Sequence, residues 1–221
     1  MAYLQLVLQA ASLALFIFLT ISGKVQAWMG IFAVSIIAAL ILGRVYCGWL
    51  CPINTAMRGV SWLKKKLRIK SARVPGWLTK PWVRLTALGL FVAAFAITMI
   101  SGKKLPVLPA LFVLGVMLTL VFPEELWHRY LCPYGLILSL PARKSKRKMT
   151  IDAELCNNCG MCRRVCPAKA VEKGERHHEI QKNECLVCLD CSRACKKKAI
   201  HYQSNFSTGQ GRSFRAKFIE R

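Results

Sequence analysis

Two cysteine runs of identical spacing, C-x2-C-x2-C-x3-C, constrain this chain more than any other feature. They begin at Cys156 and Cys185 in a chain of 221 residues. In runs of this spacing, three thiolates hold one [4Fe–4S] cube and the fourth ligates a second cube. Zinc is the alternative, but zinc sites usually use paired C-x2-C sets rather than four cysteines per run. The pattern therefore predicts two [4Fe–4S] clusters.

The crossed use of the fourth cysteines divides the eight residues into two ligand sets. The first set is Cys156, Cys159, Cys162 and Cys195. The second set is Cys185, Cys188, Cys191 and Cys166. Pro167 follows the first run as expected, whereas Lys196 stands at the equivalent place in the second, a departure that affects the backbone and no ligand. We expect residues 151–203 to form a small α+β domain of the bacterial-type 2[4Fe–4S] ferredoxin kind.

Charge divides the chain into two unlike parts. Residues 1–123 contain no Asp, Glu or His, although the whole chain carries 33 Lys and Arg against 10 acidic residues, a net charge of +23. Such a balance suits nucleic acid, an anionic membrane surface or an acidic partner. The apolar first half favours membrane lipid, and no motif supports nucleic-acid binding.

Residues 1–140 contain four apolar stretches long enough to cross a bilayer as helices. They cover about residues 4–22, 28–46, 85–102 and 105–123. The first stretch has neither the basic start nor the cleavage site of a signal peptide, so we expect it to be a retained helix. Short turns at Lys24 and at Lys103–Lys104 predict that the four helices form two hairpins.

The distribution of basic residues predicts the orientation. The segment 44–84 carries ten Lys and Arg, whereas the two hairpin turns carry only three. By the positive-inside rule, this segment and the C-terminal half lie in the cytoplasm. We therefore expect a multi-pass protein of the cytoplasmic (inner) membrane with both termini and the ferredoxin domain inside, where thiols stay reduced. Residues 141–150 are expected to be a basic linker at the membrane surface, and 204–221 a basic tail.

An internal repeat links the two predicted hairpins. Residues 47–52 (CGWLCP) and 128–133 (HRYLCP) align without gaps, and each segment follows the second helix of a hairpin. The i, i+4 spacing predicts that Cys47 and Cys51 share one face of a helical turn, as do His128 and Cys132. Three interpretations remain open for these four residues: an iron–sulfur cluster with one His ligand, a Cys3His zinc site, or two packed helix ends without metal.

These motifs together resemble those of the membrane polyferredoxins. The resemblance covers about residues 1–200 and lies in residues 43–52 (GRVYCGWLCP), residues 129–135 (RYLCPYG) and the two long cysteine runs. The family includes the membrane quinol-dehydrogenase subunit of periplasmic nitrate reductase systems (NapH type) and polyferredoxins of nitrous-oxide reductase maturation and cytochrome-oxidase assembly. Its members typically carry Cys where this chain has His128. The resemblance implies electron transfer between the quinone pool, or a cytoplasmic donor, and a partner redox enzyme.

Two classes of function follow from these patterns. The first is an electron-transfer subunit of a larger oxidoreductase complex, rather than a stand-alone enzyme, with quinone as a candidate partner. The second is an accessory protein that supplies electrons or handles metal during maturation of another complex. The predicted spans contain no His for b-type haem, and the chain has no C-x2-C-H motif for c-type haem. Arg163, Arg164, Lys169 and 196–198 are either a docking face for an acidic redox partner or a solvated surface.

Overall fold

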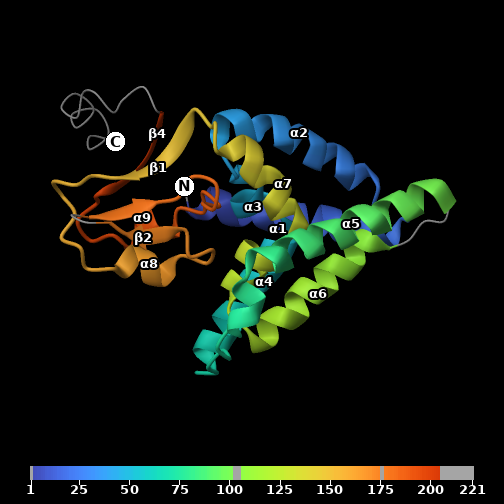
Figure 1. The fold of residues 1–221 in the computed structure, drawn as a ribbon, viewed down its shortest axis with the longest axis horizontal. Helices are drawn as coiled ribbons and strands as arrows, with labels where there is room; N and C mark the ends of the chain where they lie inside the picture. Colours follow the sequence, from blue (N-terminus) through green and yellow to red (C-terminus); the bar gives the residue numbers. More distant parts are fainter. Residues whose placement is uncertain (1, 102–105, 175–176, 205–221) are drawn as a thin grey trace.

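The computed structural model describes residues 2–101, 106–174 and 177–204 of the chain. In this part of the chain a helical lobe occupies one side of the molecule and a smaller lobe with two short sheets occupies the other (Figure 1). Several of the long helices have one end near the place where the two lobes meet.

Helices occur at all four predicted apolar stretches, with shifted ends. They are α1 (Ala2–Ile21), α2 (Ala27–Leu42), α5 (Pro81–Ser101) and α6 (Val107–Val121). The stretch predicted as 28–46 ends early because Gly43, at φ 69° and ψ −157°, adopts a conformation that only glycine takes readily. The stretch predicted from 85 begins at Pro81, because the fixed φ of proline suits the first position of a helix. The turn predicted at Lys103–Lys104 lies outside the described residues.

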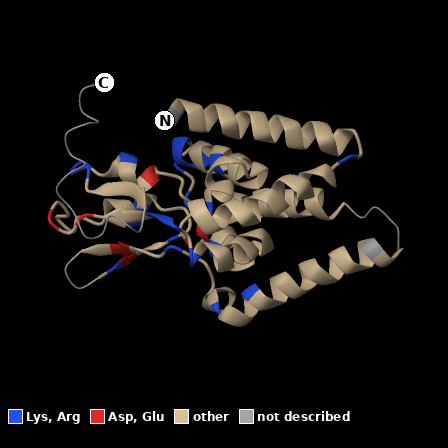
Figure 2. Cartoon of the chain, turned by 90° about the horizontal axis from the view of Figure 1, so that it is seen from above, with Lys and Arg blue, Asp and Glu red and all other residues tan. Residues whose placement is uncertain are grey.

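Two helices are long and apolar enough to cross a membrane. They cover Tyr3–Ile21 and Pro81–Thr98, whereas α2 and α6 are apolar but shorter. Figure 2 shows these helices almost free of charged residues, with Lys and Arg gathered mainly near the smaller lobe. Length and composition therefore support membrane association, with two helices that reach the length of a full span.

In each copy of the repeat the helix is interrupted at the Cys-Pro step, and a separate helix lies on each side of the interruption. In the first copy α3 (Val45–Trp49) precedes the break and α4 (Pro52–Lys66) follows it; in the second, the π-helical turn η2 (Leu126–Leu131) precedes and α7 (Pro133–Ala142) follows. Cys51 and Cys132 are themselves extended, at ψ 116° and 110°. They therefore lie between helices, each shortly after the helical turn that contains Cys47 or His128. The cause is the following proline, which disfavours a helical residue before it.

The two copies of the repeat exchange packing partners. The first helix of each hairpin packs on the helix after its own break, α1 on α4 and α5 on α7. The second helix of each hairpin packs on the other copy, α2 on α7 and α6 on α4. A single 3-10 turn, η1 (Gly76–Thr79), interrupts the connection between the copies. The helical lobe is thus an intertwined pair of equivalent halves.

Aromatic rings hold the centre of this pair together. Phe32 of α2 meets Tyr134 of α7 edge to face at 4.6 Å, and Phe91 of α5 meets the same ring at 5.1 Å. Phe32 also contacts Tyr46 of α3 at 5.5 Å. Because these rings come from both copies, their burial supports the exchanged packing at the level of the cysteine-bearing breaks.

The smaller lobe is built from two antiparallel strand pairs and two short helices. Strand β1 (Arg147–Ile151) pairs with β4 (Ile200–Ser204), and β2 (Val171–Lys173) pairs with β3 (His178–Ile180). Helices α8 (Met161–Val165) and α9 (Asp190–Ala194) each begin inside a cysteine run. Strand β1 starts within the range expected to be a linker, 141–150, and α7 extends to Ala142, so the connection between the lobes is short. The predicted tail after Ser204 lies outside the described residues.

Candidate metal centres

The backbone of the two cysteine runs repeats itself closely. Asn158 and Val187, which occupy equivalent places in the two runs, both have positive φ, at 57° and 53°. The next such pair, Gly160 and Leu189, has φ of 73° and 63° and caps the short helices α8 and α9. Positive φ is strained for a β-branched residue such as Val187, at a cost of order 1–3 kcal/mol. Both runs thus keep the same loop conformation although the local backbone preference of Val187 opposes it.

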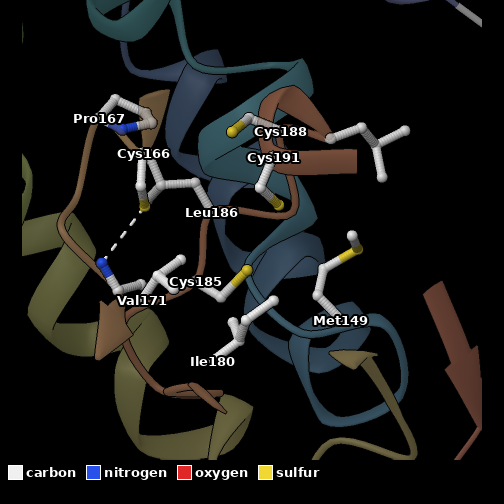
Figure 3. Close-up of a pocket in the computed structure, with 11 residues that line it drawn as sticks. Met149, Cys166, Pro167, Val171, Ile180, Cys185, Leu186, Cys188 and Cys191 are labelled. Carbon is white, nitrogen blue, oxygen red and sulfur yellow. Dashed lines mark hydrogen bonds between the residues drawn. The ribbon is translucent and has the colours of Figure 1, made fainter. Parts of the chain in front are cut away.

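Four cysteines of the second ligand set line one cavity. Cys166, Cys185, Cys188 and Cys191 surround it together with apolar side chains that include Met149 and Ile180 (Figure 3). The thiol of Cys166 accepts a hydrogen bond from the amide of Ala170 at 3.3 Å. Thiolates in an apolar shell with amide donors are the usual surroundings of an iron–sulfur cluster. The residues present therefore fit the group that the sequence predicts for them.

Burial strongly affects the thiols of this cavity. Desolvation raises the pKa of Cys185 to about 11 and that of Cys191 to about 12, and neighbouring Cys166 adds to both shifts. A backbone hydrogen bond from Val187 lowers the Cys185 pKa in part. Buried thiols of this kind are neutral until a metal replaces the proton. The cavity thus favours a neutral thiol or a metal-bound thiolate over a free thiolate.

The first ligand set lies at the more exposed end of the lobe. Cys162 is buried and its pKa is raised by desolvation and by the charges of Cys156 and Cys159. Cys159 is exposed, while Cys156 and Cys195 are partly buried. Cys162 and Cys195 both belong to the apolar cluster that includes Met149 and Ile200. We call this the distal set, and the set around the cavity the proximal set.

Three further cysteines come together in the helical lobe. Cys47, Cys51 and Cys132 are close enough for their charges to act on one another. The Cys132 thiol accepts a hydrogen bond from the Gly135 amide at 3.3 Å, and the equivalent amide, that of Asn54, bonds Cys51. Burial is the main cause that raises the pKa of both thiols, to about 12 for Cys132. The repeat therefore supplies two equivalent thiols at helix starts.

Polar groups without partners surround these cysteines. His128 is buried, Nε2 has no hydrogen-bond partner, and burial together with Arg44 and Arg58 lowers its pKa to about 3. Both polar atoms of the Asn54 side chain and Nε of Arg44 are also buried and unpartnered. The other end of the Arg44 guanidinium lies 3.9 Å from the Cys47 sulfur. Among the residues that the structure describes, no three His, Cys, Asp or Glu side chains are placed to hold a single metal ion.

The proximal set lies directly against the first copy of the repeat. A Cβ atom added to Gly48 would collide with the carbonyl oxygen of Leu186 and lie 3.2 Å from the Cys188 Cα. Trp49 donates a hydrogen bond from Nε1 to the carbonyl oxygen of Val187 at 3.0 Å. Only glycine permits this contact. The backbone of the Cys47–Cys51 turn therefore packs directly against the backbone of the Cys185–Cys191 loop.

Helix α1 clamps this contact from the side. The Gln5 amide donates to the carbonyl oxygens of Gly48 and Cys188, at 3.0 and 3.3 Å, and Gln9 donates to Gly48 at 2.8 Å. The Gln5 side-chain oxygen accepts a hydrogen bond from Arg193 at 2.8 Å. Sequence reasoning did not identify these residues, although a pair of Gln side chains at i, i+4 on an uncharged apolar helix is a usable signal.

Charged residues join the lobes on both sides of the proximal set. Glu184, next to Cys185, is buried and accepts hydrogen bonds from Arg44 at 3.4 Å and Arg84 at 2.7 Å. Asp190, next to Cys191, pairs with Arg58 through two bonds of 2.9 and 3.0 Å. Burial alone would raise the pKa of Asp190, but the Arg58 and Arg193 guanidiniums hold it below its usual value. None of these pairs was predicted from the sequence.

Comparison with known proteins agrees with this geometry. A family model described as a 4Fe-4S binding domain matches residues 24–70 and 105–152, two segments that each contain one copy of the repeat. A second, described as a 4Fe-4S dicluster domain, matches 148–204. No solved structure matches the chain. The smaller lobe with its two cysteine sets defines a polyferredoxin.

Named relatives narrow this class further. The chain is 35% identical over 148 residues to an uncharacterized protein of Methanocaldococcus jannaschii, covering 63% of this chain and 58% of the relative. It is 30% identical over 160 residues to the methylamine utilization ferredoxin-type protein MauN of Methylorubrum extorquens, covering 66% and 56%. It is 30% identical over 168 residues to the ferredoxin-type protein NapH of Haemophilus influenzae, covering 66% and 55%. The matches thus span little more than half of each relative. The chain belongs to the membrane polyferredoxin family.

Replacement of Gly48 tests the contact between the lobes. Gly48→Ala places a methyl group against the Leu186 and Cys188 backbone, which cannot move aside as a flexible side chain would, and overpacking of this kind costs roughly 1–3 kcal/mol. We expect amide hydrogen exchange in residues 185–191 to become about five- to 150-fold faster, which is the same energy expressed as an opening equilibrium. Gly89→Ala is the control, because open space surrounds Gly89. Unchanged exchange in Gly48→Ala would show that the contact does not hold this loop.

Proposed function

We propose that the chain is a membrane-anchored electron relay between the quinone pool, or a cytoplasmic donor, and a partner redox enzyme. A [4Fe–4S] cube supplies one-electron transfer at a potential set by burial, charge and hydrogen bonds. The single observation that carries the proposal is the seating of the Cys185–Cys191 loop on the Cys47–Cys51 turn. It gives the chain a buried end at the helical lobe and an exposed end at Cys159.

The residues of the chain have distinct roles in this relay. The proximal set, Cys166 with Cys185, Cys188 and Cys191, holds the inner cluster in its apolar cavity. The distal set, Cys156, Cys159, Cys162 and Cys195, holds the outer one. Gln5, Arg58 and Arg193 fix the proximal loop through its backbone carbonyls and Asp190. They keep the distance between the lobes constant and exclude water from the join.

Four membrane spans with both termini in the cytoplasm are part of the proposal. The arginines near the inner ends of the predicted spans, Arg44 and Arg84, both bind Glu184 of the smaller lobe. These contacts support a smaller lobe on the same side as the basic segment 44–84, which the positive-inside rule assigns to the cytoplasm.

The orientation is tested with a membrane-impermeant amine reagent and mass spectrometry. In right-side-out vesicles we expect labelling of Lys24, in the first hairpin turn, and protection of Lys65 and Lys196. Inside-out vesicles should give the reverse pattern, and detergent-treated vesicles, the control, should label all three. Labelling of Lys196 from outside would contradict the orientation.

A third centre formed by Cys47, Cys51, Cys132 and His128 is proposed at the membrane face. Its support is chemical: a buried thiol and a partly buried thiol at helix starts with amide donors, and a buried His128 whose Nε2 has no partner. Arg44 would offset the negative charge of such a centre.

Metal analysis of protein purified without oxygen separates the alternatives. Two cubes require about eight iron and eight sulfide per chain, and a third cube about twelve of each. We expect about twelve iron in the wild type and about eight in Cys132→Ser, with about eight also in Cys162→Ser, the control from the distal set. About eight iron and no zinc in the wild type would overturn the third centre, and about one zinc would assign it to zinc. Little iron in any form would overturn the relay.

Electron transfer itself is tested by electron paramagnetic resonance. A water-soluble quinol added to the full chain in nanodiscs should generate the signals of reduced clusters, and dithionite should generate them in every variant. In Gly48→Ala we expect the quinol-dependent rate to fall at least about tenfold, because transfer slows steeply when the lobes separate, with dithionite reduction and iron content unchanged. An equal quinol rate in both proteins would place quinone outside this path.

An accessory role in maturation is the second candidate. The observation that favours it is the group of three buried or partly buried cysteines in the helical lobe, whose thiols are close enough for their charges to act on one another. The two roles differ in their associations. Stoichiometric co-purification with an oxidoreductase supports the relay, whereas association only during assembly of that enzyme supports the accessory role.

A further inference from the structure

A basic hollow opens to solvent at the exposed end of the smaller lobe. Its volume is about 500 Å³, and its wall includes the exposed cluster ligand Cys159 and the adjoining Gly160. Arg163, Arg164 and Lys173 also line it. The hollow thus gathers several positive charges around one of the four ligands of the distal set.

Three of these charges have no acidic partner. Among the described residues Arg163, Arg164 and Lys173 form no ion pair, whereas the nearby Lys169 is paired with Glu125 at 3.3 Å. Neighbouring cations repel one another, and an acidic partner removes that repulsion on binding. A hollow lined by unpaired cations therefore favours the binding of an anionic group.

A buried histidine lies in the wall of the same hollow. His178 is only 5% exposed, and its Nδ1 has no hydrogen-bond partner. Its Nε2 lies 3.9 Å from the position that a Cβ on Gly160 would occupy. His178 therefore contributes a polar ring to the wall of the hollow, beside Gly160.

We propose that this hollow docks an acidic electron-carrier protein of the flavodoxin or ferredoxin type. Carboxylates of the carrier pair with Arg163, Arg164 and Lys173, and the edge of its cofactor faces Cys159. The proposal rests on the relay function, since only a chain that holds the distal cluster has a use for this contact. Each docking event would move one electron between the cofactor of the carrier and the cluster that the distal set would hold, one being oxidised as the other is reduced; no bond forms or breaks, and no proton is transferred.

The hollow differs from the parts of the chain suited to lipid. Membrane-facing basic segments combine cations with exposed aromatic rings, as Lys66 does over the Trp62 ring at 5.3 Å. The hollow is lined by polar and charged side chains with no aromatic carbocycle among its described residues. An acidic protein surface matches this lining better than a bilayer does.

The test uses the full chain in zwitterionic nanodiscs, prepared without oxygen, and a purified acidic flavodoxin as the probe. The variant Arg163→Gln/Arg164→Gln/Lys173→Gln removes the three cations of the hollow. The matched control Lys196→Gln/Lys197→Gln/Lys198→Gln removes three exposed cations elsewhere on the same lobe. The two variants therefore have the same net charge as each other.

We expect the dissociation constant for flavodoxin to rise about tenfold or more in the hollow variant and to change less than about twofold in the control. The salt dependence of binding should weaken in the hollow variant alone. An equal loss in both variants would reduce the effect to net charge and overturn the proposal. Loss of binding to anionic lipid vesicles with unchanged flavodoxin affinity would also overturn it, in favour of a membrane surface.

Metal content separates this proposal from the relay. Iron, sulfide and dithionite-reducible signal are measured on the same samples. If protein that contains its clusters binds flavodoxin equally well with and without the three cations of the hollow, the docking site is overturned and the relay is not. Hollow-dependent binding by protein without iron overturns the relay and leaves a binding surface.

Discussion

The join between the two lobes depends on the absence of a side chain at Gly48. Because the backbone of the first repeat touches the backbone of Leu186 and Cys188, the cysteine loop has one position in which it fits. Gln5 and Gln9 then satisfy the Gly48 carbonyl, which this close contact would otherwise leave buried without a partner. The Trp49–Val187 hydrogen bond and the Gln5 contacts with the loop lie beside this close approach.

The buried ion pairs contribute more to fixing a single arrangement of the two lobes than to the free energy of unfolding. Desolvation of Arg44 and Glu184 costs several kcal/mol per ion, which the attraction between them does no more than offset. What the pairs add is a single allowed arrangement: Glu184 binds arginines from α5 and from the start of α3, while Asp190 binds one from α4. Cys185 and Cys188 lie between these two anchors along the chain and Cys191 directly follows the second, so the spacing of this loop from the helical lobe is fixed.

The features that are visible in short windows of the sequence were predicted, whereas the contacts between distant residues were not. The cysteine spacing, the four apolar stretches and the repeat are all visible within short windows of the chain, and helices appear at each of those stretches. The pairing of Arg44 with Glu184 joins distant parts of the chain and has no periodic signal. The helices α4 and α7 were not predicted, although a proline at the first helical position marks both. The left-handed backbone of Val187 is contrary to its propensity and is imposed by the loop as a whole.

The exchanged helix packing bears on how such a chain could have arisen. A protein with one copy of the repeat would leave uncovered the face of α4 that now meets α6, and a second identical molecule would supply the missing helix. The helical lobe therefore has the architecture of a symmetric homodimer whose subunits have been joined end to end. Fusion frees the two halves to diverge, and the difference between Cys47 in one copy and His128 in the other is a divergence that a true homodimer could not have made.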